Sequence, residues 1–119
     1  MRKEEMIRPT LEVLGKIEYV RELTITQIFC SMQNKKKNDL FYMEDDEFCR
    51  YAKELFCIKD EGKYDWTPAL DTLNAAWHLV PDWRLSQLLC NVQTKDFDAL
   101  SDENFAELLK SYFNIKEEE

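Results

Sequence analysis

Three consecutive carboxylates, Asp45, Asp46 and Glu47, are the first residues of this sequence whose types could do chemistry. Carboxylate oxygens are ligands for Ca²⁺ and Mg²⁺. These residues open a predicted helix, however, so successive side chains point about 100° apart around its axis. Negative charge in a first turn also stabilises the positive end of the helix dipole. We favour this dipole and solubility role and predict no metal site.

The four cysteines and the one histidine offer little for a second kind of site. Cysteines stand at 30, 49, 57 and 90 without a Cys-x-x-Cys pair, and His78 has no cysteine or serine placed to form a nucleophile pair. We predict no catalytic residue, no cofactor and no enzymatic activity. Cys30 and Cys90 are expected to be buried as small apolar residues.

The elements that must position any site occur twice in the sequence. Residues 25–33 (Ile-Thr-Gln-Ile-Phe-Cys-Ser-Met-Gln) return sixty positions later as residues 85–93 (Leu-Ser-Gln-Leu-Leu-Cys-Asn-Val-Gln). Residues 43–48 are echoed by residues 100–105, at an offset of 57. The second copy has therefore lost three loop residues, and the chain is predicted to be an internal duplication.

Apolar residues recur at helical spacing in each copy, which predicts helices rather than strands. Start signals precede the helices: Thr24 with Gln27 as a capping box, Thr67 before Pro68, Asp82 after Pro81, and Ser101. The predicted helices cover residues 9–21, 25–33, 44–56, 68–80, 85–92 and 102–113.

These helices predict an all-α fold in which two tandem three-helix units pack as one compact domain about a pseudo-twofold axis. A tandem helical-repeat stack is the alternative. The expected organisation is a frayed lead at 1–8, a first repeat at 9–58, a connector at 59–66, a second repeat at 67–114 and an acidic tail at 115–119.

Two local features point to close packing. Residues 39–43 are too apolar for a free loop, so we expect Phe41 or Met43 to hold this segment against the core. Gly15 lies inside a predicted helix, where glycine costs about 1 kcal/mol relative to alanine. A close helix contact is the expected reason for it.

The charge of the chain is unevenly distributed. The net charge is −8, with 11 Lys/Arg against 12 Asp/Glu in residues 1–60 and 5 against 12 in residues 61–119. An acidic second half repels nucleic acid and anionic membranes, so we predict that it binds neither directly. No signal peptide and no run of ~18 apolar residues is found, which predicts a cytoplasmic protein.

Two stretches carry a resemblance. Trp77 followed by Pro81-Asp82-Trp83-Arg84-Leu85-Ser86-Gln87-Leu88, and Asp39-Leu40-Phe41-Tyr42-Met43-Glu44-Asp45-Asp46-Glu47-Phe48, are similar to the two signatures of short, uncharacterised bacterial and phage proteins. There a Trp precedes a Pro-Asp-x-Arg-x-x-Gln-Leu helix, and an Asp-x-Phe-Tyr-x-Glu-Asp-Asp-Glu loop and helix follow. Here the signatures are divided between the copies, and Ser86 stands where those proteins usually have Gly. The resemblance implies an origin in mobile elements and names no activity.

The candidate partner-binding residues follow from the acidic charge of the second half and from the Trp83-Arg84 pair. Arg84 is expected in the first turn of its helix, where a cation opposes the dipole, so a salt bridge to Asp82 or to an acidic loop should compensate it. An exposed tryptophan would mark a partner surface. The full set is Asp96, Asp98, Asp102, Glu103, Glu107, Trp83 and Arg84.

Two functions remain open at this point. The first is a non-catalytic acidic protein-binding module, in its sharper form a phage or mobile-element inhibitor of a nucleic-acid-handling enzyme, of the anti-restriction or anti-CRISPR type. Its partner would present a basic groove meant for phosphates. The second is a structural or regulatory protein that forms a homodimer through an apolar helix face.

Overall fold

The computed structural model describes residues 4–59 and 62–115, and within them the protein is all-helical. The α-helices are α1 (Glu4–Arg21), α2 (Ile25–Lys36), α3 (Asp45–Leu55), α4 (Pro68–Leu79), α5 (Leu85–Val92) and α6 (Asp102–Phe113). Two short 3₁₀ helices, η1 (Lys37–Tyr42) and η2 (Phe97–Ala99), precede α3 and α6. None of the described helices is long and apolar enough to cross a membrane.

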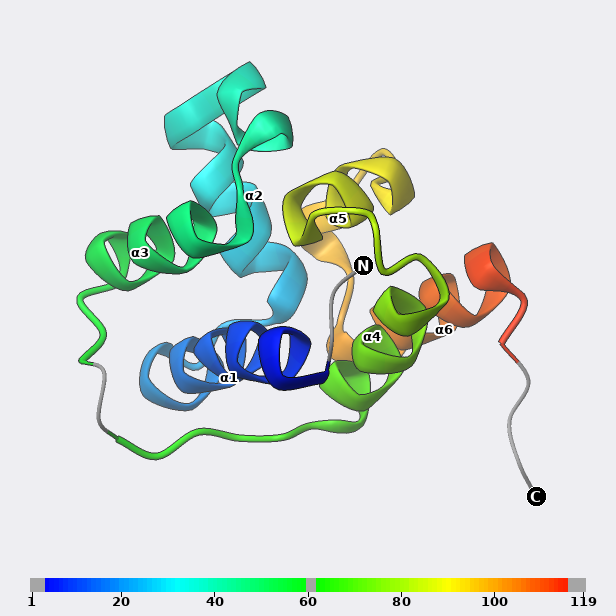
Figure 1. Cartoon of the computed structure of the whole chain (residues 1–119), viewed down its shortest axis with the longest axis horizontal. Coiled ribbons are helices and arrows are strands. Elements are labelled where there is room, and N and C mark those ends of the chain that lie inside the picture. The colour runs from blue at the N-terminus through cyan, green and yellow to red at the C-terminus, as the bar shows by residue number, and fades with distance from the viewer. Residues whose placement is uncertain (1–3, 60–61, 116–119) are drawn as a thin grey trace.

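The helices pack both within and between the two halves of the chain (Figure 1). Within the halves, α1 lies against α3 and α4 lies against α6. Between the halves, α1 contacts α4, α2 contacts η2 and α6, and α5 contacts η1 and α3. The core is therefore shared, because each half covers apolar surface of the other.

The apolar positions that share a helix face supply this core. Phe48 and Phe105, fifty-seven residues apart, are both fully buried, and so is Trp77. Other fully buried large residues come from both halves of the chain: Ile7, Leu11, Leu14, Ile17, Ile25, Ile28, Phe29, Met32 and Leu40 from the first, and Leu70, Leu73, Leu85, Leu88, Leu89 and Leu109 from the second.

The first helix begins earlier than the sequence indicated. We expected a frayed lead before Pro9, but α1 starts at Glu4 and includes Pro9. Ile7 is fully buried, so packing holds the first turn in place. Pro9 cannot donate a hydrogen bond to the preceding turn, and the Thr10 hydroxyl adds one by donating to the Met6 carbonyl at 2.9 Å. The prediction of a frayed lead is wrong from Glu4 onward, and residues 1–3 lie outside the described part.

The segment between α2 and α3 also differs from its prediction. Helix α2 runs to Lys36 instead of ending near Gln33, and η1 takes the place of the expected loop. The residue that holds this segment to the core is Leu40, which is fully buried, while Phe41 and Met43 are half-buried.

Most predicted helix starts are confirmed by their hydrogen bonds. Thr24 Oγ1 accepts from the Gln27 amide at 3.2 Å, and Gln27 Oε1 accepts from the Thr24 amide at 3.0 Å. Thr67 and Ser101 cap α4 and α6 through their hydroxyl oxygens. The prediction for α5 is wrong, because its N-cap residue is Arg84 and not Asp82.

The connector lies along α1, and Gly15 makes this possible. The Asp65 amide donates to the Gly15 carbonyl at 3.3 Å, and the Arg8 guanidinium lies 3.8 Å from the Trp66 ring centroid. A Cβ atom at position 15 would overlap the backbone carbonyl of Asp65. The close contact expected at Gly15 is thus made mainly with the connector backbone, and the Leu70 side chain of α4 also lies close to this position.

We predict that Gly15→Ala destabilises the protein by about 1–3 kcal/mol, because the connector must move away from α1. Helix propensity alone would give the opposite sign, a gain of about 1 kcal/mol. Urea denaturation measures the difference. Ala75→Gly, at the exposed position sixty residues later, is the control and should cost about 1 kcal/mol. A stabilised Gly15→Ala protein would show that the connector does not pack there.

Candidate binding surface

Helices α2 and α5 each begin on a carboxylate from the other half of the chain. The first amide of α5, at Leu85, donates to Asp45 Oδ1 at 2.9 Å. The first amide of α2, at Ile25, donates to Asp102 Oδ1 at 3.0 Å. Each carboxylate satisfies a helix N–H that has no partner within its own helix and places negative charge at the positive end of the dipole.

Hydroxyl groups make a second pair of contacts between the same segments. Thr26 Oγ1 donates to the Leu100 carbonyl at 2.8 Å, just before α6. Ser86 Oγ contacts the Met43 carbonyl at 2.8 Å, just before α3. These residues are buried, so the hydrogen bonds hold the start of each helix against the segment that precedes the opposite cap.

The two halves also meet through a glutamine pair. Gln33 Nε2 donates to Gln93 Oε1 at 3.0 Å, and Gln93 Nε2 donates to Gln33 Oε1 at 2.7 Å. Each amide thus uses one donor and one acceptor on its counterpart. Gln33 and Gln93 end the repeated segments 25–33 and 85–93, but their contact was not predicted from the sequence.

Arg84 is half-buried and is held against η1. Its Nη2 atom donates to the Phe41 carbonyl at 3.0 Å, and its guanidinium carbon lies 5.6 Å from the Phe41 ring centroid. As the N-cap residue, it also donates its amide to Gln87 Oε1 at 3.4 Å. This cation near a helix start thus contacts a carbonyl and an aromatic ring of η1. The salt bridge to Asp82 or to an acidic loop stays a prediction.

Trp83 lies between α4 and α6 and is half-buried. Its carbonyl accepts a hydrogen bond from Trp77 Nε1 at 2.8 Å, and its ring packs edge-on to Phe113 with the centroids 6.1 Å apart. Trp83 thus contacts α4 and α6, and Arg84 contacts η1. Only part of the Trp83 side chain is open to a partner.

The other predicted residues gather on η2 and the first two turns of α6. Asp96, Asp98, Glu103 and Glu107 are exposed. Asp102 is half-buried, and it is the residue of this set that caps α2. Glu107 also pairs with Lys110 at 3.4 Å. We call Asp96, Asp98, Glu103 and Glu107 the acidic face.

A buried carboxyl group behind Asp102 was not predicted from the sequence. Glu18, on α1, is only 8% exposed and forms a hydrogen bond with Asp102. Burial raises the pKa of Glu18 to about 9, and the hydrogen bond and the negative charges of Asp102 and Asp65 act in the same direction. Glu18 is thus protonated at neutral pH. The available signal was its position on the same helix face as Leu11 and Leu14, where a charged residue is unexpected.

The side chains of the cysteines and of His78 make none of the hydrogen bonds described above. Cys30 and Cys90 are half-buried against the core, and burial raises the pKa of both thiols. His78 is exposed on α4, with Nδ1 2.7 Å from the Asn74 carbonyl. Within residues 4–59 and 62–115, no three His, Cys, Asp or Glu residues are grouped so that they could hold a metal ion.

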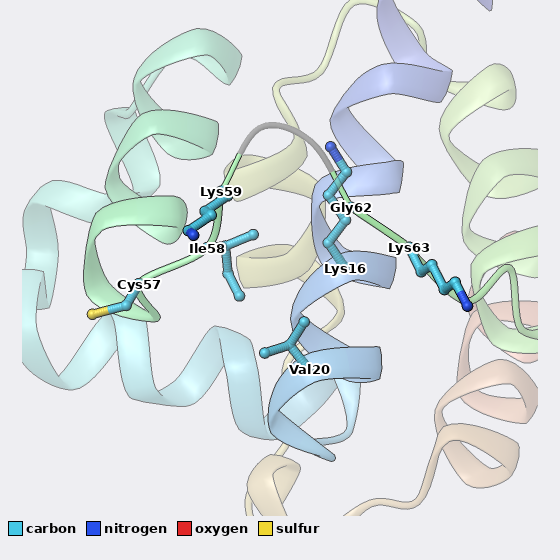
Figure 2. Close-up of a pocket in the computed structure, with 7 residues that line it drawn as sticks. All are labelled: Lys16, Val20, Cys57, Ile58, Lys59, Gly62 and Lys63. Atoms are coloured by element: carbon cyan, nitrogen blue, oxygen red, sulfur yellow. The ribbon is translucent and has the colours of Figure 1, made fainter.

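A pocket of about 240 Å³ lies between α1 and the segment that follows α3 (Figure 2). Val20 and Ile58 face each other across it, and the Lys63 side chain extends away from them along the connector. The lining residues are Lys16, Val20, Cys57, Ile58, Lys59, Gly62 and Lys63. None of them belongs to the predicted partner-binding set.

Asp45 is the better of the two caps to test, because a substitution of Asp102 would also disturb its interaction with Glu18. We predict that Asp45→Ala lowers the free energy of unfolding by about 1–2 kcal/mol, as the loss of a helix cap does. Asp45→Asn retains an acceptor oxygen and should cost less. Hydrogen exchange at the Leu85 amide, in the other half of the chain, should become faster in the alanine variant. Unchanged exchange at Leu85 would contradict the cap.

We predict that Glu18 makes the protein less stable as the pH rises. The folded state keeps the Glu18 proton up to about pH 9, whereas the unfolded chain releases it above 4.5, so the free energy of unfolding falls between these values. Glu18→Gln, which keeps the shape and cannot ionise, should raise stability at pH 8 by roughly 2 kcal/mol and at pH 5 by less than about 1 kcal/mol. Denaturation at both pH values measures this, and the exposed Glu5→Gln is the control. An equal effect of Glu18→Gln at both pH values would disprove it.

Comparison of the chain with models of known protein families, with curated proteins and with solved structures gave no match.

Proposed function

We propose that the chain consists of two tandem three-helix units, residues 9–58 and 67–114, related by a pseudo-twofold axis. The contacts between the halves support this, because they come in pairs with constant offsets. Ile25 and Leu85 are sixty residues apart, and the caps Asp45 and Asp102 are fifty-seven apart, as the duplicated sequence requires.

The ends of the third helices support the same architecture. After α3, the Ile58 amide donates to the Lys53 carbonyl at 2.9 Å, and after α6 the Ile115 amide donates to the Lys110 carbonyl at 2.9 Å. In each case the residue before the isoleucine has a φ of 55°. This is the Schellman helix ending, and it recurs at the same offset of 57.

We further propose that the protein is a non-catalytic, acidic protein-binding module. The observation that carries this proposal is the acidic face, four exposed carboxylates on η2 and the start of α6. Their net charge attracts a basic partner and speeds its association. In the form we favour, the partner is a nucleic-acid-handling enzyme whose basic groove the acidic face occupies.

The packing beneath the acidic face suits this role. Phe97 and Phe105 are buried behind it, with ring centroids 5.7 Å apart, and Phe97 also packs edge-on to Phe29 of α2. Carboxylates carried by such a packed frame lose little conformational freedom on binding. The resemblance to mobile-element proteins favours an inhibitor of the anti-restriction or anti-CRISPR type.

Self-association is the second candidate function, and the exposed apolar residues favour it. Leu79 on α4 is 58% exposed and Tyr112 on α6 is 50% exposed. Tyr19 and Val20, at the end of α1, are similarly open. Light scattering over a range of protein concentrations distinguishes this candidate: a dimer that Leu79→Lys dissociates would support it, and a monomer at all concentrations would exclude it.

We predict that Glu103→Lys with Glu107→Lys slows association with a basic partner at least tenfold at low salt and flattens its salt dependence, because two carboxylates become repulsive. The partner is first identified by affinity capture with the intact protein. Surface plasmon resonance at 50–300 mM NaCl then gives the association rate.

The matched control is Glu47→Lys with Glu54→Lys on α3, which changes the net charge equally at exposed positions outside the acidic face. It should slow association much less. If both pairs of substitutions act equally, only the overall charge matters, and the acidic face is a solubility surface.

A further inference from the structure

The pocket between α1 and the segment after α3 has apolar walls that are open to solvent (Figure 2). Val20 is 50% exposed, and Ile58, which faces it, is half-buried. The helix ending of α3 holds Ile58 in this place, because Cys57 has a φ of 55° and the Ile58 amide donates to the Lys53 carbonyl. The backbone thus fixes one wall of the pocket, and α1 provides the other.

Three lysines line the same pocket, and none of its described lining residues is acidic. Lys16 precedes Val20 by one helical turn, so both lie on the same face of α1. Lys59 and Lys63 come from the chain after α3 and are exposed. Lysine carries its charge on a flexible four-carbon stem, so an ammonium group can reach a ligand at the mouth of the pocket. Residues 60–61 lie outside the described part of the chain and belong to no part of this site.

The repeated unit does not require this opening. In the proposed architecture, Lys16 corresponds to Ala76, which is fully buried. Val20 corresponds to Val80, which is half-buried. The second half therefore covers a position that the first half leaves open and surrounds with positive charge.

We propose that the pocket binds a small apolar carboxylate, with its apolar body between Val20 and Ile58 and its carboxylate beside Lys16 and Lys59. The pocket has a volume of about 240 Å³. A protein cavity of about 150 Å³ holds benzene, so a fused two-ring group fits here by size. Burial of the rings removes apolar surface from water, and the ammonium groups favour an anion. The inference is independent of the proposed protein partner, because no residue of this pocket belongs to the acidic face.

The test titrates the intact protein with 2-naphthoate and follows the backbone amides by NMR. Saturable shifts at Val20 and Ile58 are expected, with a dissociation constant of roughly 1 mM or lower for a ligand of this size. Two probes keep the rings and change the charge. Neutral 2-naphthylmethanol should bind about fivefold more weakly, and cationic 2-naphthylmethylammonium more weakly still. If only the net charge of −8 mattered, the cation would bind best.

Variants separate the lysines from the apolar walls. Lys16→Gln with Lys59→Gln should weaken 2-naphthoate binding about fivefold and leave 2-naphthylmethanol binding unchanged. Lys35→Gln with Lys95→Gln changes the net charge equally at exposed positions outside the pocket and is the matched control. Val20→Thr keeps the shape of an exposed side chain and adds a hydroxyl, so it should weaken both probes.

Equal binding of the anionic and cationic probes would overturn this inference, and so would an equal loss of affinity in the two lysine double variants. Shifts centred on the exposed Leu79 and Tyr112 instead of Val20 and Ile58 would show that the rings prefer another apolar surface. The absence of saturable binding at millimolar 2-naphthoate would also contradict it. None of these results bears on the acidic face, which the charge-reversal experiment tests separately.

Discussion

The starts of α2 and α5 depend on carboxylates that the other half of the chain provides. Asp45 accepts from the Leu85 amide and Asp102 from the Ile25 amide. Both amides are near the core, where an unpaired N–H is costly. Neither half therefore completes its second helix alone, and the packing of α2 on η2 and of α5 on η1 follows from this exchange. The same contacts hold part of the acidic face in place, because Asp102 is the first residue of the helix that carries Glu103 and Glu107.

Local sequence signals predicted the local structure well. Thr67 and Ser101 cap their helices through bonds to residues three positions away, so the pattern alone is sufficient to identify them. Asp82 carried the same type of signal and does not cap α5, because the helix begins after Arg84, and Asp45, forty residues away from Leu85, accepts from its first amide. Periodicity likewise gave the helical character of α1 but not its start, which depends on the burial of Ile7. The errors occur where a distant contact decides the outcome.

The candidate site divides in the same way. Exposure of Asp96, Asp98, Glu103 and Glu107 follows from their positions opposite the apolar stripe of a predicted helix and from a polar turn. Asp102 and Arg84 were predicted to bind a partner in the same way, whereas both make hydrogen bonds to other parts of the chain. The buried Glu18 was not predicted, because its raised pKa depends in part on Asp102, which lies eighty-four residues later in the sequence.

In the architecture and function proposed above, one half of the chain would carry the binding surface while both halves maintain the fold. In the proposed architecture, Glu18 corresponds to His78 and Glu107 corresponds to Arg50, at the offsets of sixty and fifty-seven. The shared positions are those that build the fold: the caps, the glutamine pair and the buried Phe48 and Phe105. Buried positions can still differ, as Ile17 and Trp77 or Phe29 and Leu89 do, because core residues of the two halves can repack together. The carboxylate caps are more constrained, because each one completes a helix of the other half, and charge differs around them, where the second half is the more acidic.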